Sequence, residues 1–440
     1  MTDIFSLIRR DKEFIHSVEA VREQLSANNP LPIAVNGLQG GATSAFLIES
    51  VREARRLSGV PVLILVRDDT AAIKVTSSLS DAGICALRYK SREPVFHNIS
   101  ASADVDRERL SVLLSVMRTE CDAVVSTLTA ALSYTMPRTV LNEGSLSLGV
   151  GDEASFSELE AKLSSLGFSR VETVESAGQF AVRGGILDIL TSSENSPTRI
   201  EFFGDEVDRI SVFDIDSQRT VGEGERLSIF PALEVIIDKA ASLRIIKEID
   251  KLLPSASDEI SREKLLRERS YLEAGLPLPS RDKYFSLIYK EKENLFSYFL
   301  SLTSRAAVFT LGTNEIREEA SKRIDIITAT VSELISAGLA SKSASQTTAA
   351  VSALDGILSS LARIDINPFA GGLGTMRLGG LFGFRCRRTM EYGGSPTLLF
   401  EDVKALRKSL YRTLILTETK QGADSLIASL ASEEIYAEPI

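Results

Sequence analysis

The sequence contains almost no histidine, few cysteines and no tryptophan. Its two histidines, His16 and His97, leave little from which to build a metal site or a Ser-His-Asp triad. Its three cysteines lie far apart and form no CxxC pair, which argues against a zinc site and against a disulfide framework. We therefore expect no bound metal and no catalytic group of these kinds. A reducing cytoplasm is the simplest setting for such a chain.

Long apolar runs and excess positive charge are also missing. No apolar run approaches the roughly 18 residues of a membrane span, and the start, MTDIFSLIRRDKEF, lacks the apolar stretch of a signal peptide. The net charge is −10. Nucleic-acid affinity comes from neutralising phosphates, so an acidic chain is poorly suited to gripping DNA over its whole surface. We expect a soluble protein without membrane contact, whose direct partner is a protein.

Apolar runs alternate with helical patterns in the first part of the chain. Val60–Val66 and Asp122–Ser126 are typical of parallel strands buried on both faces, and helices are expected at 70–82 and 105–119. Ala306–Leu311 indicates a further strand that returns to the same sheet after a mainly helical stretch. This order predicts an α/β fold with a parallel sheet.

The pattern changes near residue 140. A helix is expected at 155–166, and strands are expected at Gln179–Leu190, Thr198–Phe203 and Asp205–Asp214. Gly204-Asp205 predicts a tight turn between two of these strands. Gly184 and Gly185 predict a bulge within one strand, which would turn Arg183 and Asp188 outward together. We expect an α+β insert built on antiparallel pairing.

The last hundred residues have a different composition. Residues 337–350 are small and polar, as in a flexible linker. Residues 366–396 are rich in glycine and carry an arginine cluster at Arg385, Arg387 and Arg388. From Thr397 we expect a helix, a strand at Thr413–Thr417 and a second helix, which together suggest the start of another α/β domain.

A glycine-rich loop lies between a short apolar run and a helix. A working phosphate loop has the pattern GxxxxGK[ST], in which backbone N–H groups and the lysine hold the phosphates and the hydroxyl holds magnesium. Residues 37–44 here are GLQGGATS, so Thr43 stands where the lysine is needed. The loop residues of interest are Gly37, Gly40, Gly41, Thr43 and Ser44. We expect a degenerate loop that hydrolyses nothing and needs no cofactor, or a glycine turn that only packs strand against helix.

The most specific stretch runs from Phe180 to Thr220 and includes FAVRGGILDIL and TRIEFFGDEVDRISVFDIDSQRT. It resembles the domain shared by two bacterial families, the UvrB excinuclease proteins and the transcription-repair coupling factors. The resemblance implies a RecA-like (P-loop NTPase-like) parallel-sheet domain, interrupted by an insert that docks a second excinuclease protein, UvrA.

Three features favour the coupling factors over the UvrB family. The phosphate loop is degenerate, and the Tyr-rich stretch of the UvrB hairpin is absent near residues 88–100. In addition, Asn294–Phe299 (NLFSYF) resembles an element of the coupling factors. The alternative is a UvrB-type, ATP-dependent excinuclease or helicase component, and the missing lysine speaks against it.

The resemblance also implies a domain organisation and a binding surface. The boundaries that we predict are 1–140 and 232–335 for the two halves of the RecA-like domain, 141–231 for the insert, 336–396 for a linker region and 397–440 for the start of a truncated α/β domain. Residues for UvrA docking are predicted at Arg170, Phe180, Arg183 and Gly184. Two alternatives stay open: Arg183 pairs with Asp188 or Glu201 within the sheet, and Phe180 belongs to the core.

In the coupling factors, the ATP- and magnesium-dependent DNA translocase and the RNA polymerase-binding domain follow this region. We therefore expect this sequence to be a piece of a longer protein that reaches RNA polymerase and DNA through its missing part. The expected function is recruitment of UvrA to a stalled polymerase in transcription-coupled nucleotide excision repair.

Overall fold

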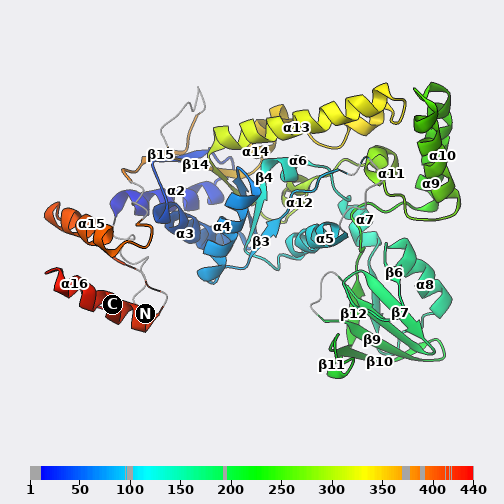
Figure 1. Ribbon diagram of the computed structural model, residues 1–440, viewed down its shortest axis with the longest axis horizontal. Coiled ribbons are helices and arrows are strands. Elements are labelled where there is room, and N and C mark those ends of the chain that lie inside the picture. The colour runs from blue at the N-terminus through cyan, green and yellow to red at the C-terminus, as the bar shows by residue number, and fades with distance from the viewer. Residues whose placement is uncertain are drawn as a thin grey trace.

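The computed structural model describes residues 11–94, 96, 103–191, 196–368, 377–386, 392–411, 413–415, 417 and 419–439. A seven-stranded sheet with helices on both faces forms the centre, and a smaller sheet domain lies beside it at the lower right of Figure 1. The predicted α/β fold, a parallel-sheet domain interrupted by an α+β insert, is confirmed.

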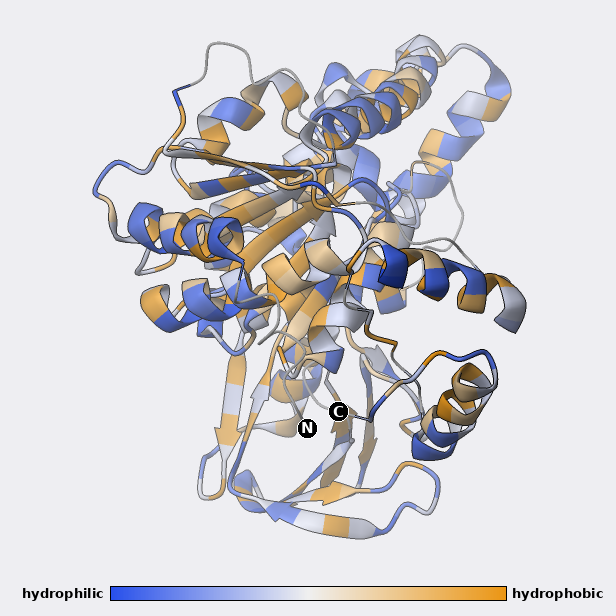
Figure 2. Cartoon of the chain, turned by 90° about the vertical axis from the view of Figure 1, so that its left-hand side faces the viewer, coloured by the Kyte–Doolittle hydropathy of each residue, from blue (hydrophilic) through white to orange (hydrophobic). Residues whose placement is uncertain are grey.

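The large sheet has the strand order β15-β1-β14-β13-β2-β4-β3, and all its strand pairs are parallel. Its strands are β1 (Ile33–Asn36), β2 (Val62–Val66), β3 (Ala86–Tyr89), β4 (Ala123–Thr127), β13 (Ala307–Leu311), β14 (Ala362–Asn367) and β15 (Gly380–Gly383). Every residue of β2 is buried, as expected for a strand covered on both faces. Figure 2 shows hydrophobic residues concentrated on these central strands.

Two groups of helices cover the two faces of this sheet. One face packs against α2 (Lys12–Ser26), α3 (Gly41–Ser58) and α4 (Asp69–Asp81). The helical elements that build the larger core on the other face are α5 (Ala103–Arg118), α6 (Leu128–Leu132), α9 (Lys239–Leu252), α10 (Glu259–Glu273), α11 (Phe285–Ile288), α12 (Leu295–Leu300), α13 (Thr313–Ser336) and α14 (Leu354–Leu358). The short helix α7 (Arg138–Glu143) and the 3-10 turns η1 (Leu253–Ser255), η2 (Arg281–Tyr284), η3 (Lys342–Ser345) and η4 (Val351–Ala353) join them.

The predicted linker region 336–396 is wrong, because it contains two strands of the large sheet. β14 pairs with both β1 and β13, and β15 pairs with β1. The arginine and the aspartate of β14, Arg363 and Asp365, concealed the strand in the sequence, since charged residues are rarely buried unless paired. They form an ion pair of 2.9 Å within the sheet. Arg385 is described, whereas Arg387 and Arg388 lie outside the described residues.

The predicted flexible stretch 337–350 is also packed. Leu339, Ala340 and Ala344 are buried in the larger core. The backbone N–H of Tyr134 donates to the carbonyl oxygen of Thr347 at 2.9 Å. Small residues suit an exposed linker, but they also allow two backbones to approach closely. Here they allow the backbone of this segment to approach that of Tyr134.

The insert contains a six-stranded sheet of order β11-β10-β9-β8-β7-β6 and a two-stranded ribbon of β12 and β5. Its elements are β5 (Leu146–Gly149), α8 (Phe156–Ser165), β6 (Ser169–Arg170), β7 (Gln179–Arg183), β8 (Ile186–Leu190), β9 (Thr198–Phe203), β10 (Glu206–Phe213), β11 (Thr220–Gly224) and β12 (Arg226–Ile229). One face of the sheet and helix α8 share a separate hydrophobic core. The predicted turn at Gly204-Asp205 is confirmed between β9 and β10.

The single strand predicted at Gln179–Leu190 is wrong. The chain turns back at Gly184 and Gly185, and β7 and β8 form an antiparallel hairpin in which Arg183 faces Ile186. Gly184 has φ +60°, so the glycine pair closes a two-residue turn instead of making a bulge. The turn puts Phe180 and Val182 of β7 and Leu187 and Ile189 of β8 on the core face, and Arg183 on the other face.

The C-terminal residues form two packed helices. Helices α15 (Pro396–Lys408) and α16 (Lys420–Ser432) share a small core through Val403, Leu430 and Ile435. The strand predicted at Thr413–Thr417 does not form at residues 413–415 and 417, and residue 416 lies outside the described residues. Within the described ranges, none of the helices is long and apolar enough to cross a membrane.

Candidate docking surface

The glycine loop joins β1 to α3, where a phosphate loop stands in a RecA-like sheet. Gly37 has φ +82°, and a Cβ on it would lie 2.0 Å from the carbonyl oxygen of Phe384, so this glycine serves packing against the segment after β15. The N–H groups of Thr43 and Ser44 donate to the carbonyl oxygen of Gly40 at 3.1 and 3.4 Å. The N–H groups of these two residues are therefore engaged within the first turn of α3.

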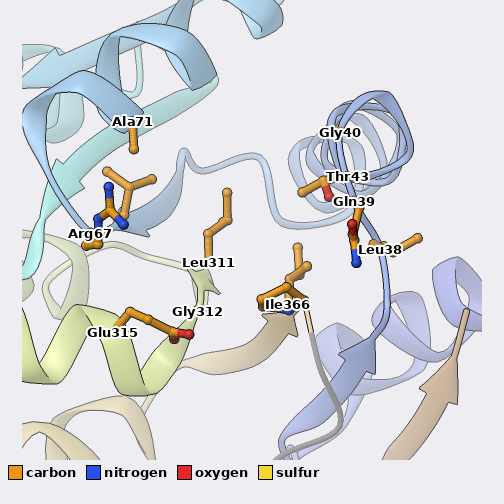
Figure 3. Close-up of a pocket in the computed structure, with 12 residues that line it drawn as sticks. Leu38, Gln39, Gly40, Thr43, Arg67, Ala71, Leu311, Gly312, Glu315 and Ile366 are labelled. Atoms are coloured by element: carbon orange, nitrogen blue, oxygen red, sulfur yellow. The ribbon is translucent and has the colours of Figure 1, made fainter. Parts of the chain in front are cut away.

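A cavity of about 410 Å³ adjoins this loop at the carboxyl ends of the parallel strands. Figure 3 shows Arg67 and Glu315 across the cavity from Thr43. Arg67 is the one basic side chain among the lining residues, and its guanidinium lies 2.8 Å from the carboxylate of Asp68. That hydrogen bond raises the pKa of Arg67. Its charge is therefore already matched by a carboxylate.

The same cavity offers no good magnesium ligand. Strand β13 is followed there by Gly312, and the one acidic lining residue is Glu315, in the first turn of α13. A triphosphate would meet an apolar wall, a paired arginine and a repelling carboxylate. In the described part of the chain, no group of three or more His, Cys, Asp or Glu side chains is arranged to hold a metal ion.

The structure separates the four residues predicted for docking. Phe180 is fully buried in the insert core, so its predicted role as a contact residue is wrong and the core alternative holds. Arg170 stands opposite Phe180 in the register and pairs with Glu160 of α8 at 2.8 Å. Because paired residues project to the same side, Arg170 lies on the α8 face of the sheet. Arg183 and Gly184 are exposed together at the tip of the β7-β8 hairpin.

Arg183 pairs with neither of the carboxylates considered from the sequence. Its Nε donates to the carbonyl oxygen of Glu172 at 3.0 Å, and its Nη2 donates to Oγ1 of Thr173 at 2.6 Å. Among the described residues, no carboxylate lies within 4.0 Å of its guanidinium. Arg183 therefore presents an unneutralised positive charge.

Asp188 does not turn outward with Arg183, contrary to the prediction. It is 5% exposed, and Arg199 holds it with two hydrogen bonds of 2.7 and 2.9 Å. The Arg199 guanidinium also lies 4.6 Å from the centre of the Phe213 ring. This ion pair closes the middle of the outer face and leaves the hairpin tip exposed.

Phe203 is a candidate contact residue that the sequence reasoning missed. It ends β9 and is 83% exposed. The N–H of Phe202 donates to the carbonyl oxygen of Gly185 at 2.8 Å, which places the tips of the two hairpins side by side. The signal was the alternation of β9: Ile200 and Phe202 face the core, so Phe203 must project outward.

We call the exposed end of this face the hairpin-tip surface, defined by Arg183, Gly184, Ile186, Glu201 and Phe203. Across the strands Arg183 faces Ile186, Ile186 faces Glu201, and Glu201 faces Arg209. A Cβ added at Gly184 would meet no atom within 4 Å, so a partner backbone can approach there. An exposed aromatic ring and an uncompensated arginine on one surface are the usual chemistry of interface anchors.

A buried ionic cluster joins the insert to the large domain. Glu234, just beyond β12, accepts two hydrogen bonds from Arg109 of α5 at 2.7 and 2.9 Å. Asp106 of the same helix accepts from Arg92 at 2.6 Å and from Arg281 at 2.8 Å. Burial opposes the charged form of Asp106, yet Arg92 and Arg281 lower its pKa. These bonds attach the segment at the C-terminal end of the insert to the large domain.

Comparisons with known proteins place the hairpin-tip surface within a recognised domain. Residues 146–234 match the family described as the UvrB interaction domain. The match contains both hairpins and ends at Glu234, the residue bound by Arg109.

Longer alignments extend over much of the chain. It is 28% identical over 315 residues to the transcription-repair-coupling factor of Bacillus subtilis, covering 68% of this chain and 26% of that protein. It is 29% identical over 222 residues to the same factor of Escherichia coli, covering 50% of this chain and 19% of that protein. The UvrABC system protein B of Kosmotoga olearia is 33% identical over 180 residues, covering 40% of this chain and 26% of that protein.

The chain therefore aligns with about a quarter or less of the length of these relatives. The predicted resemblance to the UvrB-like region of transcription-repair coupling factors is confirmed by these alignments together with the domain match.

Proposed function

We propose that this chain is a docking module of nucleotide excision repair that binds UvrA through the hairpin-tip surface. The observation that carries the proposal is the exposed pair of Phe203 and Arg183 inside the stretch that matches the UvrB interaction domain. The aromatic ring would be buried in the partner, and Arg183 would meet a carboxylate of the partner. Gly184 lets the two backbones approach.

In this proposal the chain neither binds nor hydrolyses a nucleotide. The loop has Thr43 in place of lysine, the N–H groups of Thr43 and Ser44 are engaged within α3, and Glu315 in the adjacent cavity would repel phosphate. These features support a binding module over the alternative, a UvrB-type ATP-dependent enzyme. They also favour a function like that of the coupling factors over a function like that of the UvrB proteins.

In the larger setting, we propose that the module brings UvrA to a stalled RNA polymerase. The relatives named transcription-repair-coupling factors support this role by their name and by alignment with up to 68% of this chain. Contacts with RNA polymerase and DNA, and ATP-driven translocation, would belong to regions of the relatives that do not align with this chain.

Binding of purified UvrA to the 440-residue chain tests the docking surface. Arg183→Glu and Phe203→Ala should each weaken binding roughly 30-fold or more, because truncation of an anchor residue costs about 2 kcal/mol or more. Arg170→Glu is the matched control, since it changes an exposed arginine of the same sheet on the opposite face. Circular dichroism should show all three variants folded. Wild-type affinity of folded Arg183→Glu and Phe203→Ala would overturn the proposed surface.

A further inference from the structure

We propose that Thr173 is a positioning residue that holds the guanidinium of Arg183 in the orientation needed for docking. The inference rests on the proposed function of the hairpin-tip surface and adds a residue to it. Thr173 itself lies outside the strands, in the segment between β6 and β7. Its hydroxyl is one of two groups that accept hydrogen bonds from Arg183.

The segment that carries Thr173 is anchored across the outer face of the sheet. Val174 is 1% exposed and packs in a small cluster with Ala181 and Leu190, which belong to β7 and β8. The N–H of Val171 donates to the carbonyl oxygen of Phe180 at 2.9 Å. Thr173 therefore lies between two fixed points, so that its hydroxyl has a defined position.

The other end of the segment is held by a side chain of β7. The amide oxygen Oε1 of Gln179 accepts from the N–H groups of Glu175 and Ser176 at 2.9 and 3.1 Å. Only a few residues separate this clamp from Thr173. The carbonyl oxygen of Glu172 and the hydroxyl of Thr173 thus form a rigid acceptor pair beneath Arg183.

We call this acceptor pair, the carbonyl oxygen of Glu172 and the hydroxyl of Thr173, the brace. The brace affects how Arg183 can bind a partner. An arginine side chain loses much rotamer freedom when a partner fixes it, and a side chain that is already fixed loses less on binding. The brace uses Nε and Nη2, whereas Nη1 makes no hydrogen bond with the described residues. That end of the guanidinium is left to meet a carboxylate of the partner. The carbonyl oxygen of Glu172 accepts from both Nε and Nη2, and the Thr173 hydroxyl adds a second acceptor for Nη2, which fixes the tilt of the guanidinium plane about that oxygen.

The test measures affinity of the 440-residue chain for UvrA in a double-mutant cycle. Thr173→Val removes the hydroxyl at nearly constant volume and should weaken binding about fivefold, which corresponds to one net hydrogen bond. Thr173→Ser keeps the hydroxyl and should restore wild-type affinity. In the Arg183→Ala background, Thr173→Val should change the affinity less than twofold, because the group that it positions is gone.

The control is Thr328→Val, which removes a threonine hydroxyl that bonds the carbonyl oxygen of Ile324 within α13, far from the insert (Figure 1). It should bind as the wild type does. Thermal melting of every variant checks the fold, and Thr173→Ala replaces Thr173→Val if the valine variant does not fold.

Each remaining outcome has a distinct meaning. If Arg183→Ala binds weakly and folded Thr173→Val binds as the wild type, the positioning role is refuted and the docking surface stands. If Thr173→Val weakens binding equally with and without Arg183, Thr173 acts independently and the inference is also refuted. If Arg183→Ala itself binds as the wild type, both the inference and the assignment of Arg183 fail.

Discussion

Removing the carboxylate of Glu234 should destabilise the protein severely. Glu234 and Arg109 are each 1% exposed and share two hydrogen bonds of 2.7 and 2.9 Å. In Glu234→Ala the Arg109 guanidinium stays buried, with the carbonyl oxygen of Lys90 and the hydroxyl of Tyr89 as its remaining partners. Breaking one side of a buried ion pair costs about 3–5 kcal/mol, because the other charge is left uncompensated. Urea unfolding followed by circular dichroism measures this loss.

An exposed ion pair of the insert provides the control. Glu223 accepts from Arg209 at 2.7 Å, but its side chain is 76% exposed. Water and salt screen such a pair, so Glu223→Ala should cost at most about 1 kcal/mol. The double variant Arg109→Met with Glu234→Leu removes both charges at similar volume and should recover much of the stability lost in Glu234→Ala. Equal, small losses for Glu234→Ala and Glu223→Ala would refute the reasoning.

Two further predictions follow from the glycine loop and from the ionic cluster. Calorimetric titration of the chain with Mg-ATP should give no saturable binding in the micromolar range, because Thr43 offers no charge to the phosphates and Glu315 repels them; micromolar saturation lost in a Gly40→Val variant would contradict this. The pKa of Asp106 is lowered from 3.8 in the folded state, so its contribution to stability is present above this value and is lost as the pH falls through the lowered pKa. Melting temperatures recorded down to about pH 3 should therefore fall less steeply for Asp106→Asn than for the wild type, and parallel curves would count against it.

The parts of the fold that were predictable depend on local signals. The apolar run Val60–Val66 predicted β2 because a strand covered on both faces has no polar side, and the structure buries every residue of it. β14 escaped notice because Arg363 and Asp365 are charged, and charged residues are rarely buried unless they are paired, as these two are. Asp365 also accepts from Thr310 of β13, 55 positions away, and this contact and the burial of the pair depend on tertiary structure that no local pattern contains.

The candidate site was predictable only where a local signal in the sequence exists. The resemblance pointed to Arg183 and Gly184, and the structure exposes both residues. Phe180 was assigned to the docking surface by the resemblance, and no role was predicted for Phe203, because the sequence was interpreted as one strand through Gly184. Once the turn is placed there, Phe180 faces the core and the exposure of Phe203 follows from β9 alone. The brace by Thr173 depends on a crossing of the sheet by a loop, which sequence spacing does not show.

The position of β1 in the large sheet has a consequence for synthesis on the ribosome. Its only strand neighbours in the described sheet are β14 and β15, and the facing residues Asn36 and Asn367 are 331 positions apart. At roughly 5–20 residues per second, β1 waits on the order of tens of seconds with both edges unpaired. The insert joins its strands β7 to β10 by consecutive hairpins, so its contacts are local and form early. The nascent chain would thus carry a completed docking domain while the sheet that supports it is still waiting for its central strands.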